Sequence, residues 1–198
     1  MNKIIKNTGI LMAITLVAGA LLGLVYEVTK TPIAQAQEDA KQEAYRTVLA
    51  DADTFVNEEG FKESKAQKIL NKAGYVSDDI SEVVVGQATS GETVGYVITV
   101  TSHEGYGGDI QISVGIETDG TVKGIEMLSI SETAGLGMKA TEADFKDQFK
   151  DKKVEKFSYT KSGEEGDDKI DALSGATITT NAVTNAVDSA LAYFQEEL

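Results

Sequence analysis

The chain has 198 residues, of which 41% are apolar and 25% charged, as is typical of a folded protein about the size of one domain. Its formal net charge of −14 argues against nucleic acid as a partner, because binding to a phosphate backbone needs clustered Lys and Arg. The absence of cysteine excludes cysteine zinc sites, thiolate-held iron–sulfur clusters, thiol nucleophiles and disulfides.

An uncharged stretch of 19 residues lies near the N-terminus, from Thr8 to Tyr26. As a helix rising about 1.5 Å per residue, it is long enough to cross the roughly 30 Å hydrocarbon layer of a bilayer. Lys3 and Lys6 precede it, so the positive-inside rule predicts that residues 1–7 are cytoplasmic and that the rest is exported. We therefore predict a single-pass protein of the cell (inner or cytoplasmic) membrane, anchored in the lipid bilayer by residues 8–26. The exported part contains 32 acids and 16 bases, a net charge of −16.

A cleaved signal peptide is the alternative interpretation of this stretch. Ala34-Gln35-Ala36 has the small-x-small pattern of a cleavage site, but it lies well beyond Tyr26. The apolar stretch is also longer than the 7–15 residues that are usual for the apolar part of a signal peptide. Both interpretations export the residues that follow, and they differ only in whether the anchor is kept.

Two helices are predicted between the membrane span and the first strand. Pro32 is expected to end the membrane helix, because proline cannot continue it in register, and to begin a new one. Apolar residues at helical spacing predict that this second helix covers Ile33–Leu49, within a helical connector of residues 27–50. Another helix is expected at Lys62–Ala73, with Gly74 just beyond its end.

Four segments rich in Val and Ile then follow, with alternating apolar and polar residues and with Gly or Asp between them. They are Glu82–Ala88, Thr93–Thr101, Asp109–Glu117 and Thr121–Ile130. The pair Asp119-Gly120 is typical of a tight hairpin turn. The other connections are too short for crossover helices, so we expect these strands to be antiparallel neighbours.

The C-terminal part is predicted to hold a short helix near Thr141–Phe149, a polar strand near Val154–Thr160, an acidic surface loop at Ser162–Asp168 and a last helix at Thr180–Glu197. This last helix has a clear apolar stripe, formed by Ala182, Val183, Ala186, Val187, Ala190, Leu191 and Phe194. Residues 51–198 are therefore expected to form one extracytoplasmic α+β domain. It should consist mainly of antiparallel sheet with flanking helices, preceded by one transmembrane helix.

Three patterns that could indicate other chemistry fail on inspection. Asp51-Ala-Asp53 resembles the start of a calcium loop, but Val56 stands where that loop needs glycine and Lys62 where it needs a carboxylate. Gly135-Leu-Gly-Met-Lys-Ala140 fits a dinucleotide fingerprint, but hairpin strands precede it instead of a parallel strand. The lone His103 has no nucleophile motif to serve. We expect no metal site and no hydrolytic centre.

The segment Asp171–Thr180, DALSGATITT, directly precedes the last helix and is rich in small residues. One interpretation is structural, with serine and threonine as helix caps and Gly175 in a turn. The other is functional, because small residues expose backbone N–H groups and a helix start carries partial positive charge. Together these features suit a bound phosphate. The residues alone leave both interpretations open.

The sequence Ser174-Gly-Ala-Thr177, preceded by Asp171, resembles the flavinylation motif of the FMN-binding family. That family includes the G subunit of the Rnf electron-transport complex and the C subunit of the sodium-translocating NADH:quinone reductase. The stretch Ser131-Glu-Thr-Ala-Gly-Leu-Gly137 resembles the family's E-T-P-G-L-G pattern, with Ala134 in place of proline. Gly105-Tyr-Gly-Gly-Asp-Ile110 matches as well. With the single N-terminal span, the resemblance covers most of the chain, and the short length favours the Rnf branch.

The resemblance implies a covalent cofactor, with FMN joined through its phosphate to the hydroxyl of Thr177. This threonine phosphoester would be made by a separate flavin transferase that acts on exported protein. By the same resemblance, Asp171 and Ser174 guide the transferase or hold the loop. The residues that we expect to bind the cofactor are Thr177, Ser174, Gly175, Ala176, Asp171, Glu132, Thr133, Gly135, Leu136, Gly137, Tyr106 and Gly107. Of these, Glu132, Thr133 and the glycines that follow them are expected to approach the flavin ring.

Such a flavoprotein would relay electrons between neighbouring membrane subunits of an Rnf-type complex. By the same resemblance, the whole complex couples ferredoxin oxidation and NAD⁺ reduction to ion translocation, of Na⁺ or H⁺. The chain would be an electron-transfer subunit of this oxidoreductase and not a complete enzyme. Three alternatives stay open: a subunit of the quinone-reductase type, a free-standing extracellular electron-transfer flavoprotein, and a non-redox anchored module for anion binding or assembly.

Overall fold

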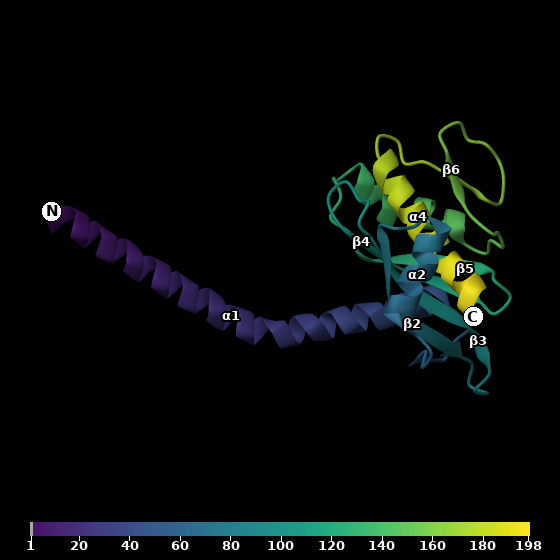
Figure 1. Ribbon diagram of the computed structural model, residues 1–198, viewed down its shortest axis with the longest axis horizontal. Helices are drawn as coiled ribbons and strands as arrows, with labels where there is room; N and C mark the ends of the chain where they lie inside the picture. Colours follow the sequence, from purple (N-terminus) through teal and green to yellow (C-terminus); the bar gives the residue numbers. More distant parts are fainter. Residues whose placement is uncertain (1) are drawn as a thin grey trace. The chain divides into compact units, whose positions relative to one another are not determined.

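The structure, a computed structural model, describes residues 2–198 and contains two compact units that divide between Lys41 and Gln42. The helix α1 (Asn2–Val48) makes up the described part of the first unit and continues into the second (Figure 1). In the described part of the chain, α1 alone is long and apolar enough to cross a membrane, with a mean hydropathy of 2.3 over its most apolar part.

The predicted break at Pro32 is wrong, because this proline lies inside α1. A proline removes the N–H of only one helical hydrogen bond, and its fixed φ near −65° is compatible with a helix. The helical spacing that was seen from Ile33 onward therefore continues the same helix instead of beginning a new one.

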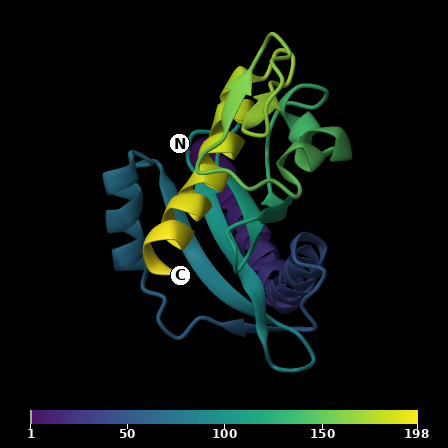
Figure 2. The same cartoon turned by 90° about the vertical axis from the view of Figure 1, so that its right-hand side faces the viewer.

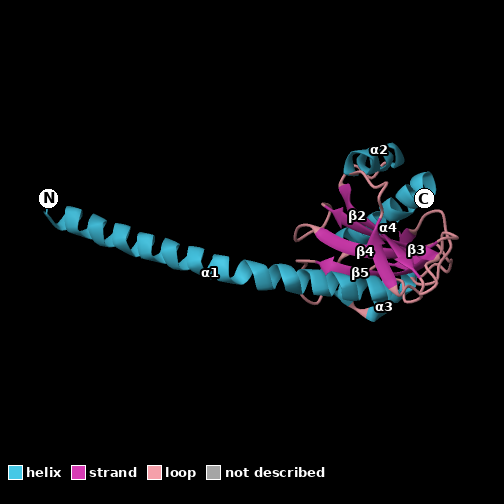
Figure 3. Ribbon diagram, turned by 90° about the horizontal axis from the view of Figure 1, so that it is seen from below, coloured by secondary structure: helices cyan, strands magenta, loops and turns pink. Residues whose placement is uncertain are grey.

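The second unit is built on an antiparallel sheet with the strand order β1-β2-β3-β4-β5 (Figure 3). The strands are β1 (Thr54–Asn57), β2 (Asp78–Gln87), β3 (Thr93–Ser102), β4 (Ile110–Glu117) and β5 (Val122–Ser129). This sheet confirms the predicted α+β class and the hairpin at Asp119-Gly120, where Gly120 has a φ of +89°. The strand β1 was not predicted, and β2 begins four residues before the expected Glu82.

Helices and short segments complete the second unit. The α2 helix (Glu63–Ala73) ends at Gly74 as predicted. After β5 comes a compact segment of three short helices, the 3-10 helix η1 (Gly137–Thr141), the α-helix α3 (Ala143–Lys146) and the 3-10 helix η2 (Asp147–Phe149). The strand expected at Val154–Thr160 is only β6 (Ser158–Thr160), and it pairs in parallel with the unpredicted β7 (Lys169–Asp171). The last helix, α4 (Thr177–Glu197), begins three residues earlier than expected.

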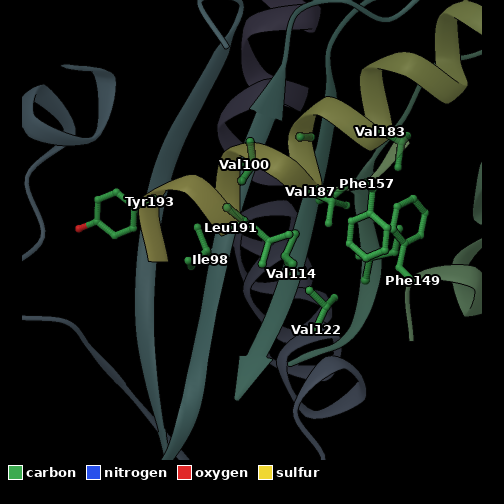
Figure 4. Packing of buried hydrophobic residues seen from close by; sticks show 14 of the residues in the cluster. Ile98, Val100, Val114, Val122, Phe149, Phe157, Val183, Val187, Leu191 and Tyr193 are labelled. Atoms are coloured by element: carbon green, nitrogen blue, oxygen red, sulfur yellow. The ribbon is translucent and has the colours of Figure 1, made fainter. Parts of the chain in front are cut away.

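The α4 helix crosses one face of the sheet and buries the whole predicted apolar stripe apart from the partly buried Phe194 (Figure 2). It packs on a row of apolar residues that pair across four strands, namely Val83, Ile98, Val114 and Ile125. Figure 4 shows Val187 and Leu191 of α4 directed at this face, with Phe149 and Phe157 nearby. Each buried side chain of this size contributes roughly 1.5–3 kcal/mol, so the packing fixes α4 firmly on the sheet.

The opposite face of the sheet receives the last turns of α1, from Gln42 onward. Tyr45, Val48 and Leu49 are buried there against Val84 and Val97. A glycine makes this approach possible, because a Cβ atom built on Gly115 of β4 would lie 2.1 Å from the carbonyl oxygen of Val48. The central strands are therefore covered on both faces.

A polar cluster lies at the buried edge of α4. The Asp188 carboxylate accepts hydrogen bonds from the Phe157 N–H (2.7 Å) and from the Tyr75 hydroxyl (3.3 Å). Beside it, Ser189 Oγ donates to Asp78 Oδ2 at 2.6 Å. Burial raises the pKa of Asp188 to about 7 and also raises the pKa of Asp78. The hydrogen bonds from the Phe157 N–H and the Tyr75 hydroxyl, together with the charge of Lys156, lower the pKa of Asp188 and offset the effect of burial only in part.

The stability of the second unit should therefore fall as the pH rises. The folded state holds the Asp188 proton more tightly than the unfolded chain, where the pKa of the carboxyl is 3.8. The protonated carboxyl therefore stabilises the folded state fully below about pH 4, and this contribution is lost as the pH rises through about 7. The expected loss is up to about 1.4 kcal/mol per pH unit. In Asp188→Asn this contribution should be absent. Unfolding of the detergent-solubilised chain, followed by near-ultraviolet circular dichroism from pH 4 to 8, measures it, and parallel profiles for the two proteins would contradict the assignment.

Candidate functional site

A cavity of about 530 Å³ lies where three separate segments of the second unit meet. The segments are the β3–β4 loop, the stretch between β5 and η1 with the first residue of η1, and the start of α4 with the loop before it. The residues on its wall are Tyr106, Glu132, Thr133, Leu136, Gly137, Gly175, Ala176, Thr177, Ile178 and Thr179. The fold thus brings together both of the motifs that the sequence analysis singled out.

The start of α4 forms one wall and has no side-chain cap. The cap position is Ala176, and the first backbone bond of the helix runs from the Thr180 N–H to the Ala176 carbonyl. The N–H groups of Thr177, Ile178 and Thr179 therefore have no helical acceptor, and the helix dipole adds partial positive charge there. Alanine is a poor cap, so an anion in this cavity would supply acceptors that the chain itself does not.

The hydroxyl groups around this helix start differ in accessibility. Thr180 is fully buried, and its Oγ1 donates to the Ala176 carbonyl (3.0 Å) and accepts from the Leu173 N–H (3.1 Å). Thr179 is 1% exposed, whereas Ser174 is exposed but does not line the cavity. Thr177 is half-buried and on the wall, so its hydroxyl is both reachable and next to the uncapped N–H groups.

The opposite wall is a tight turn that needs glycine. The Thr133 carbonyl accepts hydrogen bonds from the N–H groups of Leu136 (3.1 Å) and Met138 (3.2 Å), and Gly135 within the turn has a φ of +75°. At Gly137 the two walls come close, because a Cβ atom there would lie 2.6 Å from Thr179 Oγ1. Larger residues at either position would disturb the contact between the walls.

Three large apolar side chains stand exposed around this cavity. Tyr106 is 71% exposed, Ile178 53% and Leu136 43%, and each comes from a different one of the three segments. Exposed apolar side chains are ordinary when scattered, but three that gather around one cavity mark a binding surface. Together with the helix start, they fit a ligand that has a phosphate at one end and a flat apolar ring at the other, as FMN has.

Four of the predicted cofactor residues lie behind the wall or away from it. The Gly107 N–H donates to Glu132 Oε1 at 3.1 Å and so supports a wall residue, and Gly135 shapes the turn. Ser174 is exposed outside the cavity. Asp171 ends β7, and its N–H donates to Gln148 Oε1 at 2.6 Å.

Two wall residues, Ile178 and Thr179, were not predicted from the sequence. The last helix was expected to start at Thr180, which assigned both residues to the preceding loop. The signal was present, since N–H groups that bind a phosphate at a helix start belong to its first turn, and Thr177 had already been chosen as the attachment point.

The single histidine lies outside the cavity wall. Its Nδ1 is 2.8 Å from Asp109 Oδ1 and its Nε2 is 2.9 Å from Asp79 Oδ2. Hydrogen bonding to these two carboxylates raises the pKa of His103. The residue therefore holds the base of the β3–β4 loop. Across residues 2–198, no cluster of three His, Asp or Glu side chains could hold a metal ion.

Comparisons with known proteins agree with this geometry. The FMN-binding domain matches residues 105–192, which include every residue of the cavity wall, and the RnfG N-terminal region matches residues 1–48. The G subunit of the Na⁺-translocating ferredoxin:NAD⁺ oxidoreductase complex of Acetobacterium woodii is 32% identical over 98% of this chain and 93% of its own length. The G subunit of the ion-translocating oxidoreductase complex of Methanosarcina acetivorans is 35% identical over 97% and 95%, respectively. The chain belongs to the RnfG family.

Two solved structures share the fold of this RnfG family member. The C subunit of the Na⁺-translocating NADH-quinone reductase of Parabacteroides distasonis superposes with a TM-score of 0.54 and 20% identity, covering 83% of this chain and 96% of that chain. NqrC of Shewanella oneidensis gives a TM-score of 0.50 and 23% identity over 60% of each chain. At these identities the likeness concerns the fold alone.

The hydroxyl of Thr180 should matter for stability and not as an attachment point. Thr180→Val keeps the shape of the side chain but removes both hydrogen bonds and leaves the partly buried Leu173 N–H without its partner, at a cost of about 1–3 kcal/mol in unfolding free energy. Thr180→Ser keeps the hydroxyl and should lose less. Denaturant unfolding of the two variants measures the difference. Equal stability of Thr180→Val and the unaltered chain would contradict this role.

Proposed function

We propose that this chain carries FMN covalently at Thr177 and relays electrons within an Rnf-type ferredoxin:NAD⁺ oxidoreductase that translocates ions. One observation supports the proposal above all, namely the cavity itself. There the accessible Thr177 hydroxyl lies beside an uncapped helix start and an apolar rim formed by Tyr106, Leu136 and Ile178. The nearly full-length similarity to G subunits of ion-translocating complexes favours the Rnf type over the quinone-reductase type.

The start of α4 would hold the phosphate end of the cofactor. The three N–H groups without helical acceptors can donate to phosphate oxygens, and the helix dipole stabilises the charge that the ester retains. The bond joins Thr177 Oγ1 to phosphorus, so the chain gains the mass of FMN less one water. By the resemblance to the FMN-binding family, a separate flavin transferase would form this bond.

The rim would hold the ring end. Tyr106, Leu136 and Ile178 offer apolar surface to a flat ring and exclude water from its face. Bound FMN supplies the electron-carrying chemistry, while the chain positions it and shapes its surroundings. Because these side chains are exposed, the ring would lie at the surface, where a neighbouring redox subunit can approach it.

The helix α1 would anchor this domain in the lipid bilayer of the cytoplasmic membrane. Lys3 and Lys6 before the apolar stretch favour a cytoplasmic N-terminus, so the FMN domain would be outside the cytoplasm. The expected partners are the other membrane subunits of the complex and, during maturation, the flavin transferase.

Thr177→Ala should abolish covalent FMN. The change removes the acceptor hydroxyl, and since Thr177 makes no capping bond, the loss of stability should stay within about 1 kcal/mol. Co-expression with a flavin transferase, followed by intact-mass measurement, tests the prediction. Thr177→Ser should retain some flavin because its hydroxyl remains. Ser174→Ala should retain flavin because it leaves the Thr177 acceptor in place. Flavin found on Thr177→Ala, or mapped to Ser174, Thr179 or Thr180, would refute the assignment.

The orientation can be tested in living cells. A reporter that is active only in the cytoplasm, fused after Leu198, should be silent, whereas one that is active only outside should work. Removing the positive charge is the matched control. Replacing Lys3 and Lys6 by glutamine removes the charge difference between the two ends of the membrane span and should allow mixed orientation. Strong activity of the cytoplasmic reporter in the unaltered chain would exclude an exported flavin domain.

A further inference from the structure

The cavity wall contains one ionisable carboxylate, that of Glu132, and no Lys, Arg or His. Its side chain is 9% exposed. Within residues 2–198, no cation lies at ion-pair distance from it. A charge that is mostly withdrawn from water and has no counter-charge is unfavourable, so its position needs an explanation.

The carboxylate is held firmly between the walls of the site. Its Oε1 accepts a hydrogen bond from the Gly107 N–H at 3.1 Å. Its Oε2 lies over Gly137, where a Cβ atom would come within 2.7 Å of it, and the hydroxyl of Thr179 lies on the same glycine. A Cβ atom on Gly105 would also come within 3.0 Å of Oε1. Two glycines, Gly105 and Gly137, thus leave room for this one side chain, and the hydrogen bond from the Gly107 N–H holds it there.

A carboxylate is the wrong group for binding FMN tightly. The phosphate is an anion, and the donors that suit it lie at the start of α4. In addition, a neutral glutamine could accept the same hydrogen bond from the Gly107 N–H with its side-chain oxygen. Neither phosphate binding nor the support of the β3–β4 loop therefore requires the negative charge at Glu132.

We propose that Glu132 lowers the reduction potential of the bound flavin through this fixed, uncompensated negative charge. The inference rests on the proposed function, because it needs FMN in the cavity. An electron added to the flavin increases the negative charge there, and a nearby carboxylate disfavours the reduced form relative to the oxidised form. Because Glu132 is 9% exposed, water screens its charge less than it screens the charge of an exposed carboxylate.

The test is Glu132→Gln in the full chain, loaded with FMN by co-expression with a flavin transferase. The variant keeps the hydrogen bond to Gly107 and removes only the charge. We expect unchanged flavin occupancy by intact mass and a midpoint potential shifted to more positive values in a spectroelectrochemical titration. Glu142→Gln is the matched control, because it removes the same charge from an exposed side chain outside the cavity and should leave the potential unchanged.

Glu132→Ala separates the support role from the charge. It removes both the charge and the acceptor for the Gly107 N–H, so the flavin-free chain should unfold at a lower temperature than Glu132→Gln. A potential in Glu132→Gln equal to that of the unaltered chain would overturn the proposal. Loss of flavin from Glu132→Gln would also overturn it, because the charge would then serve loading. If the unaltered chain itself carried no flavin, the proposed function would fail first.

Discussion

The packing of α4 on the sheet is the interaction on which the site depends. The helix presents Thr177 and three N–H groups without helical acceptors in its first turn, and without a cap such an end tends to fray. Two features hold it in place, namely the Thr180 hydroxyl, which ties it to the preceding loop, and the apolar stripe from Ala182 to Leu191, which is buried on the sheet. Burial further along the helix thus stabilises an end that remains free to bind an anion.

The other walls of the site depend on the same sheet. The β3–β4 loop, which carries Tyr106, leaves from two strands whose apolar residues are buried on both faces. Gly115 makes the second layer possible, because its missing side chain lets the backbone of Val48 lie directly on β4. With both faces covered, the strands give the loop and the turn after β5 a fixed base, and the cavity between them has a defined width.

The sequence predicted the parts of the fold that have a strong local pattern. Alternation of apolar and polar residues located four strands and the stripe of α4, whereas β1 is too short to show a pattern. Pro32 misled because a proline removes only one helical N–H donor and its fixed φ is compatible with a helix. The start of α4 was placed too late because threonine and β-branched residues have low helix propensity, so Thr177–Thr179 were assigned to a loop. The short motifs located both walls of the cavity, but only the structure showed that Glu132 lies between them without a counter-charge.

The distribution of charge explains how a strongly acidic domain can hold an anionic cofactor. Most of its acids are exposed, where water and salt screen them beyond about 8–10 Å, so the net charge of the domain has little effect inside the cavity. The groups at contact distance decide the local field, and at the start of α4 these are N–H donors. Glu132 is the exception, since it lies on the wall and its charge is not exposed to the same screening. The cavity therefore has a positive end, which suits a phosphate, and a carboxylate on the opposite wall, whose charge would disfavour the reduced form of a bound flavin.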